Sequence, residues 1–162
     1  MTHRTLLALV PALAIASLLA LPAVAQTTTA ASAPSPSAGV AAAPAGLYQA
    51  LGEKAGITRL MDDFVDRLVK DPRIGAHFKE VKPAALKESL TDQICQLSGG
   101  PCQYEGADMK SAHADMDINK GHFNALVEVL QTAMDAQGIP FAQQNRLLAL
   151  LAPIHRDIIT LR

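Results

Sequence analysis

The apolar residues of this chain recur with the period of an α-helix, and no stretch alternates as a half-buried strand would. The clearest case spans residues 57–68, where one helix face carries the apolar set Ile57, Leu60, Met61, Phe64, Val65 and Leu68. Asp71-Pro72 ends this helix, because the residue before a proline is pushed out of the helical region. The pattern predicts an all-α fold.

Three further helices follow from local signals. Pro83 opens the second, whose apolar positions are Leu86, Leu90, Ile94 and Leu97, and Gly99-Gly100-Pro101 closes it. Asn119 caps the third, and Pro153 bends the last. Residues 103–117 show little periodicity, so we expect a loop there with at most a short helix. An irregular segment of this length inside a compact domain usually carries function.

The amino terminus is predicted to be a signal peptide over residues 1–25. Arg4 precedes an almost wholly apolar run over residues 6–21, and Ala23-Val24-Ala25 has the small-x-small pattern of a cleavage site. Residues 26–46, rich in Ala, Pro and Ser, are predicted to be a disordered linker, and residues 47–162 one domain. The protein is therefore expected to be exported, either periplasmic or secreted. It would contact a membrane only if the signal segment stays uncleaved.

Composition excludes several classes of function. The chain has 14 Lys and Arg against 15 Asp and Glu, with no basic run and few aromatic residues, which excludes nucleic acid as a partner. The mature region has four histidines, His77, His113, His122 and His155, and no pair has zinc-site spacing. No Ser or Cys lies in a recognisable nucleophile motif. We therefore assign no catalytic residue.

Cys95 and Cys102 both fall in the region expected to be exported. In an oxidising compartment two cysteines this close in sequence favour a disulfide, and two buried thiols are the alternative.

His113 is distinguished by its location in the irregular segment between two amphipathic helices. A neutral imidazole there is able to coordinate iron from one side while helices close over the other. Judged on composition alone, an exposed loop histidine is the alternative.

Six motifs in register resemble one known family. They are Leu47-Tyr48-x-x-Leu51-Gly52, Asp63-Phe64, His77-Phe78, Gly99-Gly100-Pro101-x-x-Tyr104-x-Gly106, Met109-Lys110-x-x-His113 and His122-Phe123. Together they resemble the truncated haemoglobins, group one in particular, over residues 47–159. The resemblance implies a shortened globin, a two-over-two helical sandwich around haem b and its iron.

The resemblance also implies roles for single residues. His113 matches the proximal iron ligand, and Phe78 matches the aromatic residue that stacks on the porphyrin. The other positions that match the cofactor pocket are Phe64, Val65, Leu86, Leu90, Tyr104, Met109, Ile118 and Phe123. For Phe64, Leu86, Leu90 and Phe123 plain core packing is the alternative, and it is compatible with the first role.

This sequence departs from the family where a bound gas is held. Many members have a tyrosine at the position of Val65 and a glutamine at that of Leu90, and both donors are missing here. Leu86 is apolar as well. We therefore expect an apolar distal pocket that releases oxygen quickly. The binding of carbon monoxide and nitric oxide should change less, because these gases rely less on a hydrogen-bond donor. Gln93, one turn beyond Leu90, either reaches into the pocket or faces solvent.

The function that the resemblance implies is reversible binding of a diatomic gas by haem iron. Nitric oxide dioxygenase or peroxidase-like turnover would require an unknown electron donor. One alternative is an electron-transfer or redox-sensing haem protein with six-coordinate iron, and another is an interaction module without haem. His155 lies where some cyanobacterial relatives carry a histidine bonded to a haem vinyl group, and an ordinary helix histidine is the alternative there.

Overall fold

The computed structural model describes residues 43–161, so the predicted signal peptide and most of the predicted linker lie outside the described residues. The described part is helical and contains no strand. Its helices are α1 (Leu47–Ala50), α2 (Glu53–Leu68), η1 (Gly75–Phe78), α3 (Pro83–Leu97), α4 (Met109–His113), α5 (Lys120–Ala136), α6 (Phe141–Leu151), η2 (Ala152–Ile154) and α7 (His155–Ile158). None of the helices within this range has the length and apolar character needed to cross a bilayer.

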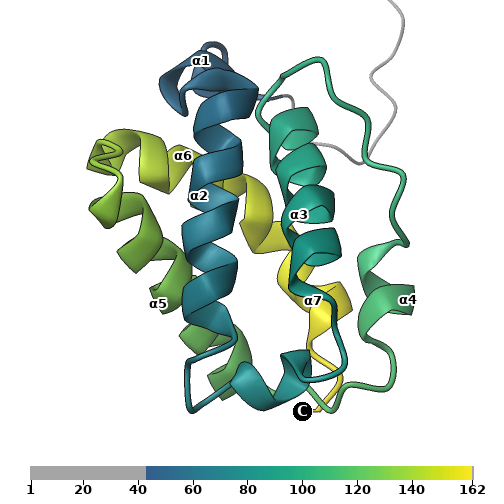
Figure 1. Ribbon diagram of the computed structural model, residues 1–162. Coiled ribbons are helices and arrows are strands. Elements are labelled where there is room, and N and C mark those ends of the chain that lie inside the picture. The colour runs from purple at the N-terminus through teal and green to yellow at the C-terminus, as the bar shows by residue number, and fades with distance from the viewer. Residues whose placement is uncertain (1–42, 162) are drawn as a thin grey trace, which may run out of the picture. The chain divides into compact units, whose positions relative to one another are not determined.

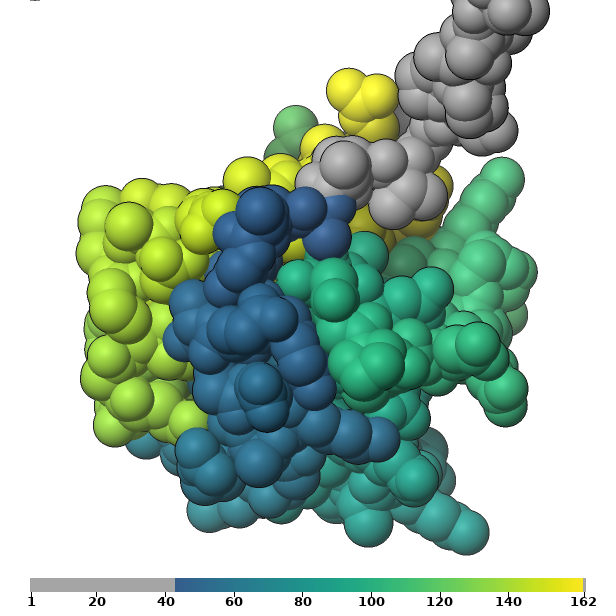
Figure 2. Space-filling model, turned by 90° about the horizontal axis from the view of Figure 1, so that it is seen from above, coloured from purple at the N-terminus to yellow at the C-terminus, as the bar shows by residue number. Residues whose placement is uncertain are grey.

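Helix α2 forms the centre of the fold. It packs most extensively against α3 on one side and against α5 on the other. Seen from the side and from above, α1 and α2 lie between the turn that joins α5 to α6 and the helix α3 (Figures 1 and 2). The predicted apolar face of α2 is buried along its whole length, from Ile57 to Leu68.

The helix ends follow the local signals in the sequence. Pro83 occupies the first turn of α3, where its missing N–H costs nothing, and α3 ends at Leu97, before the two glycines. Asn119 caps α5: its side chain accepts from the His122 N–H at 2.9 Å, and the His122 Nδ1 accepts from the Asn119 N–H at 3.4 Å. Both predicted boundaries are confirmed.

Charged pairs cross the surface between α2 and α3. Lys87 lies 2.8 Å from Asp66 and 3.7 Å from Asp62, and Lys54 lies 3.1 Å from Asp92. The hydrogen bond from Lys87 lowers the pKa of Asp66, and the same bond raises the pKa of Lys87. Exposed pairs of this kind contribute little stability singly, so the register of the two helices is set by their apolar faces.

The carboxy-terminal helix is broken where Pro153 predicts a bend. Helix α6 ends at Leu151, Pro153 lies in the 3-10 turn η2, and α7 continues from His155. The prediction of a bent last helix is confirmed. The bend lets α7 reach α4, and these two short helices pack together.

The irregular segment of residues 103–117, which we call the strap, lies in the connection between α3 and α5. Its one described helix is α4, which lies at the edge of the molecule beside α3 (Figure 1). Asp117, at the end of the strap, has a φ of 50°, a left-handed conformation that is uncommon outside glycine.

Candidate functional site: an apolar cavity with one histidine

A cavity of about 580 Å³ lies between the strap and the helices. Side chains of α2, η1, α3, the strap, α5, α6, η2 and α7 line it, and nearly all of them are apolar. The polar side chains in the lining are Ser89, Gln93, Tyr104 and His113. Cavities of this size and character bind small organic molecules or cofactors, with a few polar groups that fix orientation.

His113 lies at the carboxyl end of α4, half buried, and lines the cavity. Its Nδ1 lies 2.7 Å from the carbonyl oxygen of Met109. Because a carbonyl oxygen only accepts, Nδ1 carries the proton, and the lone pair of the neutral ring is on Nε2. A backbone carbonyl that fixes the tautomer in this way is typical of histidines that bind a metal.

Helix α4 has only five residues, so its cap matters for the position of His113. Asp108 is the N-cap residue, and its carboxylate accepts from the Ser111 N–H at 2.9 Å and from the Ser111 hydroxyl at 2.7 Å. The hydroxyl bond and then the backbone bond lower the pKa of Asp108. The carboxylate therefore stays charged at neutral pH and caps the turn that carries His113.

For the haem that the resemblance implies, replacing Asp108 with alanine is expected to speed its loss from the cavity severalfold at pH 7, because α4 loses both cap bonds and frays. Asparagine at the same position caps nearly as well and should keep haem loss close to that of the wild type. Since the pKa of Asp108 is lowered by folding, its contribution is complete above the ordinary pKa of an aspartate and is lost as the pH falls below it. Stopped-flow transfer of haem to excess apomyoglobin measures the rates, and equal rates for the alanine and asparagine variants would show that the cap does not matter.

Most of the residues predicted for the pocket lie around this cavity. The lining includes Phe64, Phe78, Leu86, Leu90, Tyr104, Met109, His113 and Phe123. These residues come from α2, η1, α3, the strap and α5, which are far apart in sequence, so the fold brings them together.

Two of the predicted pocket residues lie elsewhere. Val65 is fully buried in the core and is not part of the lining. Successive helix positions differ by about 100° around the axis, so Phe64 faces the cavity while its neighbour does not. Ile118 is buried and lines a second cavity of about 40 Å³, together with Phe78 and His113 among others. It therefore lies beside the main cavity and not in it.

Two of the other polar lining residues, Tyr104 and Gln93, have contacts of their own. Tyr104 donates its hydroxyl hydrogen to the Ala107 carbonyl at 2.9 Å. Gln93 reaches the cavity, and its Nε2 lies 3.6 Å from the sulfur of Met109. Thioether sulfur is a weak acceptor, so this amide is only loosely held.

The remaining described histidines do not line the large cavity. His77 Nε2 lies 3.2 Å from His122 Nδ1, which joins η1 to the start of α5. Nδ1 of His155 lies 2.7 Å from the Ala152 carbonyl, and its ring centroid lies 6.1 Å from that of Phe123. His113 is thus the one histidine of the described chain that lines the cavity.

Several cavity residues were not singled out from the sequence. They include Met61, Val81, Met116, Val127, Leu148 and Ile154. Most lie on apolar helix faces, where the sequence signal for a cavity wall is the same as for a packed core. Met116 follows His113 by one turn in an otherwise polar stretch, and that isolated apolar residue is the signal that could have identified it.

The cavity fits the haem that the family resemblance implies. The lining offers apolar surface for a porphyrin, and no buried side-chain nitrogen or oxygen of the described residues lacks a hydrogen-bond partner. Among those residues no group of three or more His, Cys, Asp or Glu side chains could hold a bare metal ion. A lone imidazole suits a metal whose other ligands come from its own macrocycle.

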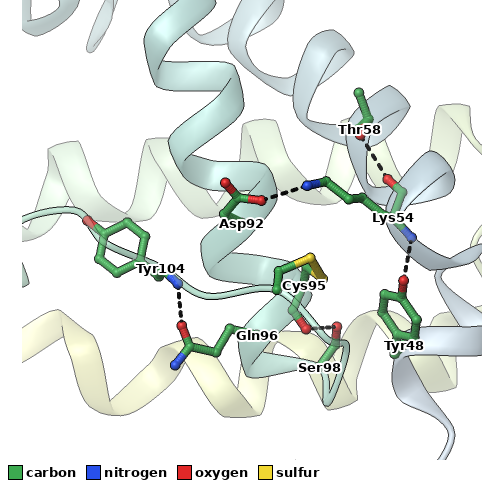
Figure 3. Close-up of a disulfide and its surroundings, with 9 residues drawn as sticks. Tyr48, Lys54, Thr58, Asp92, Cys95, Gln96, Ser98 and Tyr104 are labelled. Atoms are coloured by element: carbon green, nitrogen blue, oxygen red, sulfur yellow. Dashed lines mark hydrogen bonds and ion pairs between the residues drawn. A yellow bond between two sulfur atoms is a disulfide. The ribbon is translucent and has the colours of Figure 1, made fainter.

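Cys95 and Cys102 form a disulfide, with their Cα atoms 5.7 Å apart. The bridge joins the last turn of α3 to the segment that leads into the strap (Figure 3). One wall of the cavity is thus bonded covalently to the chain segment that carries His113.

Comparison with known proteins gives the family. The profile of bacterial-like globins matches residues 46–160. A group 1 truncated hemoglobin of Mycolicibacterium paratuberculosis is 28% identical, over 74% of this chain and 88% of its own length. One of Synechocystis is 29% identical, over 70% of this chain and 96% of its own. The crystal structure of the Tetrahymena pyriformis truncated hemoglobin in its Fe(III) form has a TM-score of 0.67 at 26% identity, covering 70% of this chain and 97% of that one. The chain therefore belongs to the bacterial-like globin family, among its group 1 truncated haemoglobins.

Proposed function

We propose that this haem-binding globin binds oxygen, nitric oxide and carbon monoxide reversibly, with His113 as the protein ligand to the iron. Haem b would supply a redox-active iron that is able to bind a diatomic gas. The observation that carries the proposal is His113 itself. It lines the apolar cavity, and its Nδ1 is committed to the Met109 carbonyl at 2.7 Å, which leaves the Nε2 lone pair for a metal.

The walls of the cavity support an apolar environment for the gas. Helix α3 contributes Leu86 and Leu90, and α2 contributes Phe64. None of these side chains donates a hydrogen bond, and Gln93 contacts the Met109 sulfur. Bound oxygen carries partial negative charge and gains from a donor more than carbon monoxide or nitric oxide does. We therefore expect fast oxygen release, which argues against oxygen storage.

Export is part of the same proposal. It is supported by the charged start, the apolar run and the small-x-small site in residues 1–25. The disulfide between Cys95 and Cys102 is consistent with an oxidising compartment, where such bonds persist. If the globin also turns over nitric oxide or peroxide, a donor outside the globin fold would have to supply the electrons.

A visible absorption spectrum of the purified protein tests the proposal. We expect a Soret band, and a five-coordinate ferrous spectrum after dithionite that shifts when carbon monoxide is added. The physical reason is that, within the described residues, His113 is the one histidine in the cavity and no lysine lines it, so the lining offers no second nitrogen ligand of the usual kinds. A six-coordinate ferrous spectrum without added ligand would favour electron transfer. Absence of any haem band after reconstitution would favour an interaction module and reject the proposal.

A further inference from the structure

The strap that carries His113 is fastened to the rest of the domain near its two ends. At its carboxyl end, the Ile118 N–H donates to the Thr160 hydroxyl at 2.9 Å. The Ile118 carbonyl accepts from the N–H groups of Thr160 and Leu161, both at 2.9 Å. These bonds tie the end of the strap to the chain beyond α7.

At its amino end the strap is fastened to α3. The disulfide joins Cys95, which is fully buried, to Cys102, which is partly exposed. The next fastening along the chain is the Tyr104 N–H, which donates to Gln96 Oε1 at 2.6 Å (Figure 3). The strongest link at this end is therefore a covalent bond that thiols can break.

Between the two ends the strap is loosely attached to α3. The direct side-chain bond between α3 and α4 is the 3.6 Å contact from Gln93 Nε2 to the Met109 sulfur, which is weak. Helix α4 packs mainly on α7, itself a short helix, and the cavity lies beneath the strap. How closely α4 stays over the cavity thus depends on the fastenings at its ends.

We propose that the Cys95–Cys102 disulfide is a redox-sensitive fastening that sets how tightly the protein retains haem. The inference rests on the proposed function, because it takes His113 as the iron ligand. When the disulfide is intact, the strap is held at both ends and His113 stays over the cavity. When it is reduced, the amino end keeps only the Gln96–Tyr104 bond, and the strap opens more often.

The reduction is a thiol–disulfide exchange with an external dithiol, either a small molecule or a protein of that class. A thiolate attacks Sγ of Cys102, because Sγ of Cys95 is buried. The S–S bond breaks, Cys95 leaves as a thiolate and takes up a proton. The second thiol of the reductant then gives up its proton and displaces Cys102, which is protonated in turn. Two electrons pass to the two cysteines, and the reductant becomes a disulfide.

Haem transfer to excess apomyoglobin measures the consequence. The haem-loaded protein is compared oxidised, after reduction with dithiothreitol, and as the Cys95→Ser/Cys102→Ser double variant. We expect the reduced protein and the double variant to lose haem about tenfold faster than the oxidised protein, which corresponds to about 1.4 kcal/mol. Dithiothreitol should leave the rate of the double variant unchanged, which controls for effects of the reagent on haem.

Limited trypsin digestion of the haem-loaded protein shows whether the change is local. Lys110 is exposed on the strap, whereas Lys79 is exposed just after η1 and serves as the reference site. Reduction should speed cleavage after Lys110 and leave cleavage after Lys79 unchanged. Equal acceleration at both sites would mean general destabilisation and would overturn the inference.

The Gln96→Ala variant tests the order of the fastenings. It removes the acceptor of the Tyr104 N–H, so it should matter little in the oxidised protein and should speed haem loss strongly in the reduced one. Equal haem loss from oxidised and reduced wild-type protein would overturn the redox fastening and leave the proposed function intact. A protein that binds no haem in either state would instead reject the proposed function.

Discussion

Replacing His113 with glycine should strip most of the haem from the purified protein and remove the five-coordinate imidazole spectrum. Within the described chain no other histidine lines the cavity, so no second imidazole is positioned to replace it. Haem is quantified as its pyridine complex. Protein is quantified by amino-acid analysis, since the chain has only two tyrosines and no tryptophan to absorb at 280 nm. Free imidazole should restore the spectrum by filling the space that the side chain leaves.

His155 provides a matched control for this substitution. Like His113 it is half buried on a short helix, and its Nδ1 also lies 2.7 Å from a backbone carbonyl oxygen of the preceding turn, that of Ala152. It differs in that it does not line the cavity. The His155→Gly variant should therefore keep its haem and its spectrum. If the His113 variant retained full haem content with an unchanged Soret band, the assignment of the iron ligand would be wrong.

The helices of this fold could be predicted because their signals are local. Pro83 and the glycines after Leu97 fix the ends of α3, and Asn119 fixes the start of α5, each through bonds within a few residues. The bend at Pro153 has the same origin. The start of α2 was less clear, since it begins at Glu53, whose φ of 57° is uncommon, before the first residue of the apolar face.

The division between core and cavity could not be predicted in the same way. Phe64 and Val65 are equally apolar neighbours on α2, and both are buried, yet only Phe64 lines the cavity. Periodicity indicates which face of a helix is covered but not whether side chains or a cavity cover it. Gln93 is a second example. Its polar side chain on α3 is compatible with solvent and with the cavity, and the structure places it in the cavity lining.

The prediction of the candidate site depended more on the resemblance to the truncated haemoglobins than on the properties of single residues. A histidine in an irregular segment is most often an exposed one, and it was the register of the surrounding motifs that selected His113. Its tautomer, by contrast, follows from a bond to the carbonyl of Met109 within the same turn. The proximity of α4 to α3 across the cavity depends on tertiary packing, which no local pattern reports.

Replacing Leu90 with glutamine should slow oxygen release by roughly ten- to a hundredfold. A hydrogen bond to a partly charged ligand contributes about 1.5 to 3 kcal/mol, and about 1.4 kcal/mol corresponds to one factor of ten. Leu90 lines the cavity, so an amide at its position enters the space in which we propose that the gas binds. Val65, the other position where family members carry a donor, is fully buried outside the lining, and a tyrosine there would first have to displace core side chains.

The Leu97→Gln variant controls for the chemistry of this change. Leu97 lies two turns further along α3 and does not line the cavity, so the same substitution there should leave oxygen release as in the wild type. Flash photolysis and stopped-flow mixing give the release rates of oxygen and carbon monoxide for each variant. The Leu90 variant should slow oxygen far more than carbon monoxide, because only oxygen gains much from a donor. Equal slowing of both gases would point to a narrower cavity, and the apolar lining would then not be the reason for fast oxygen release.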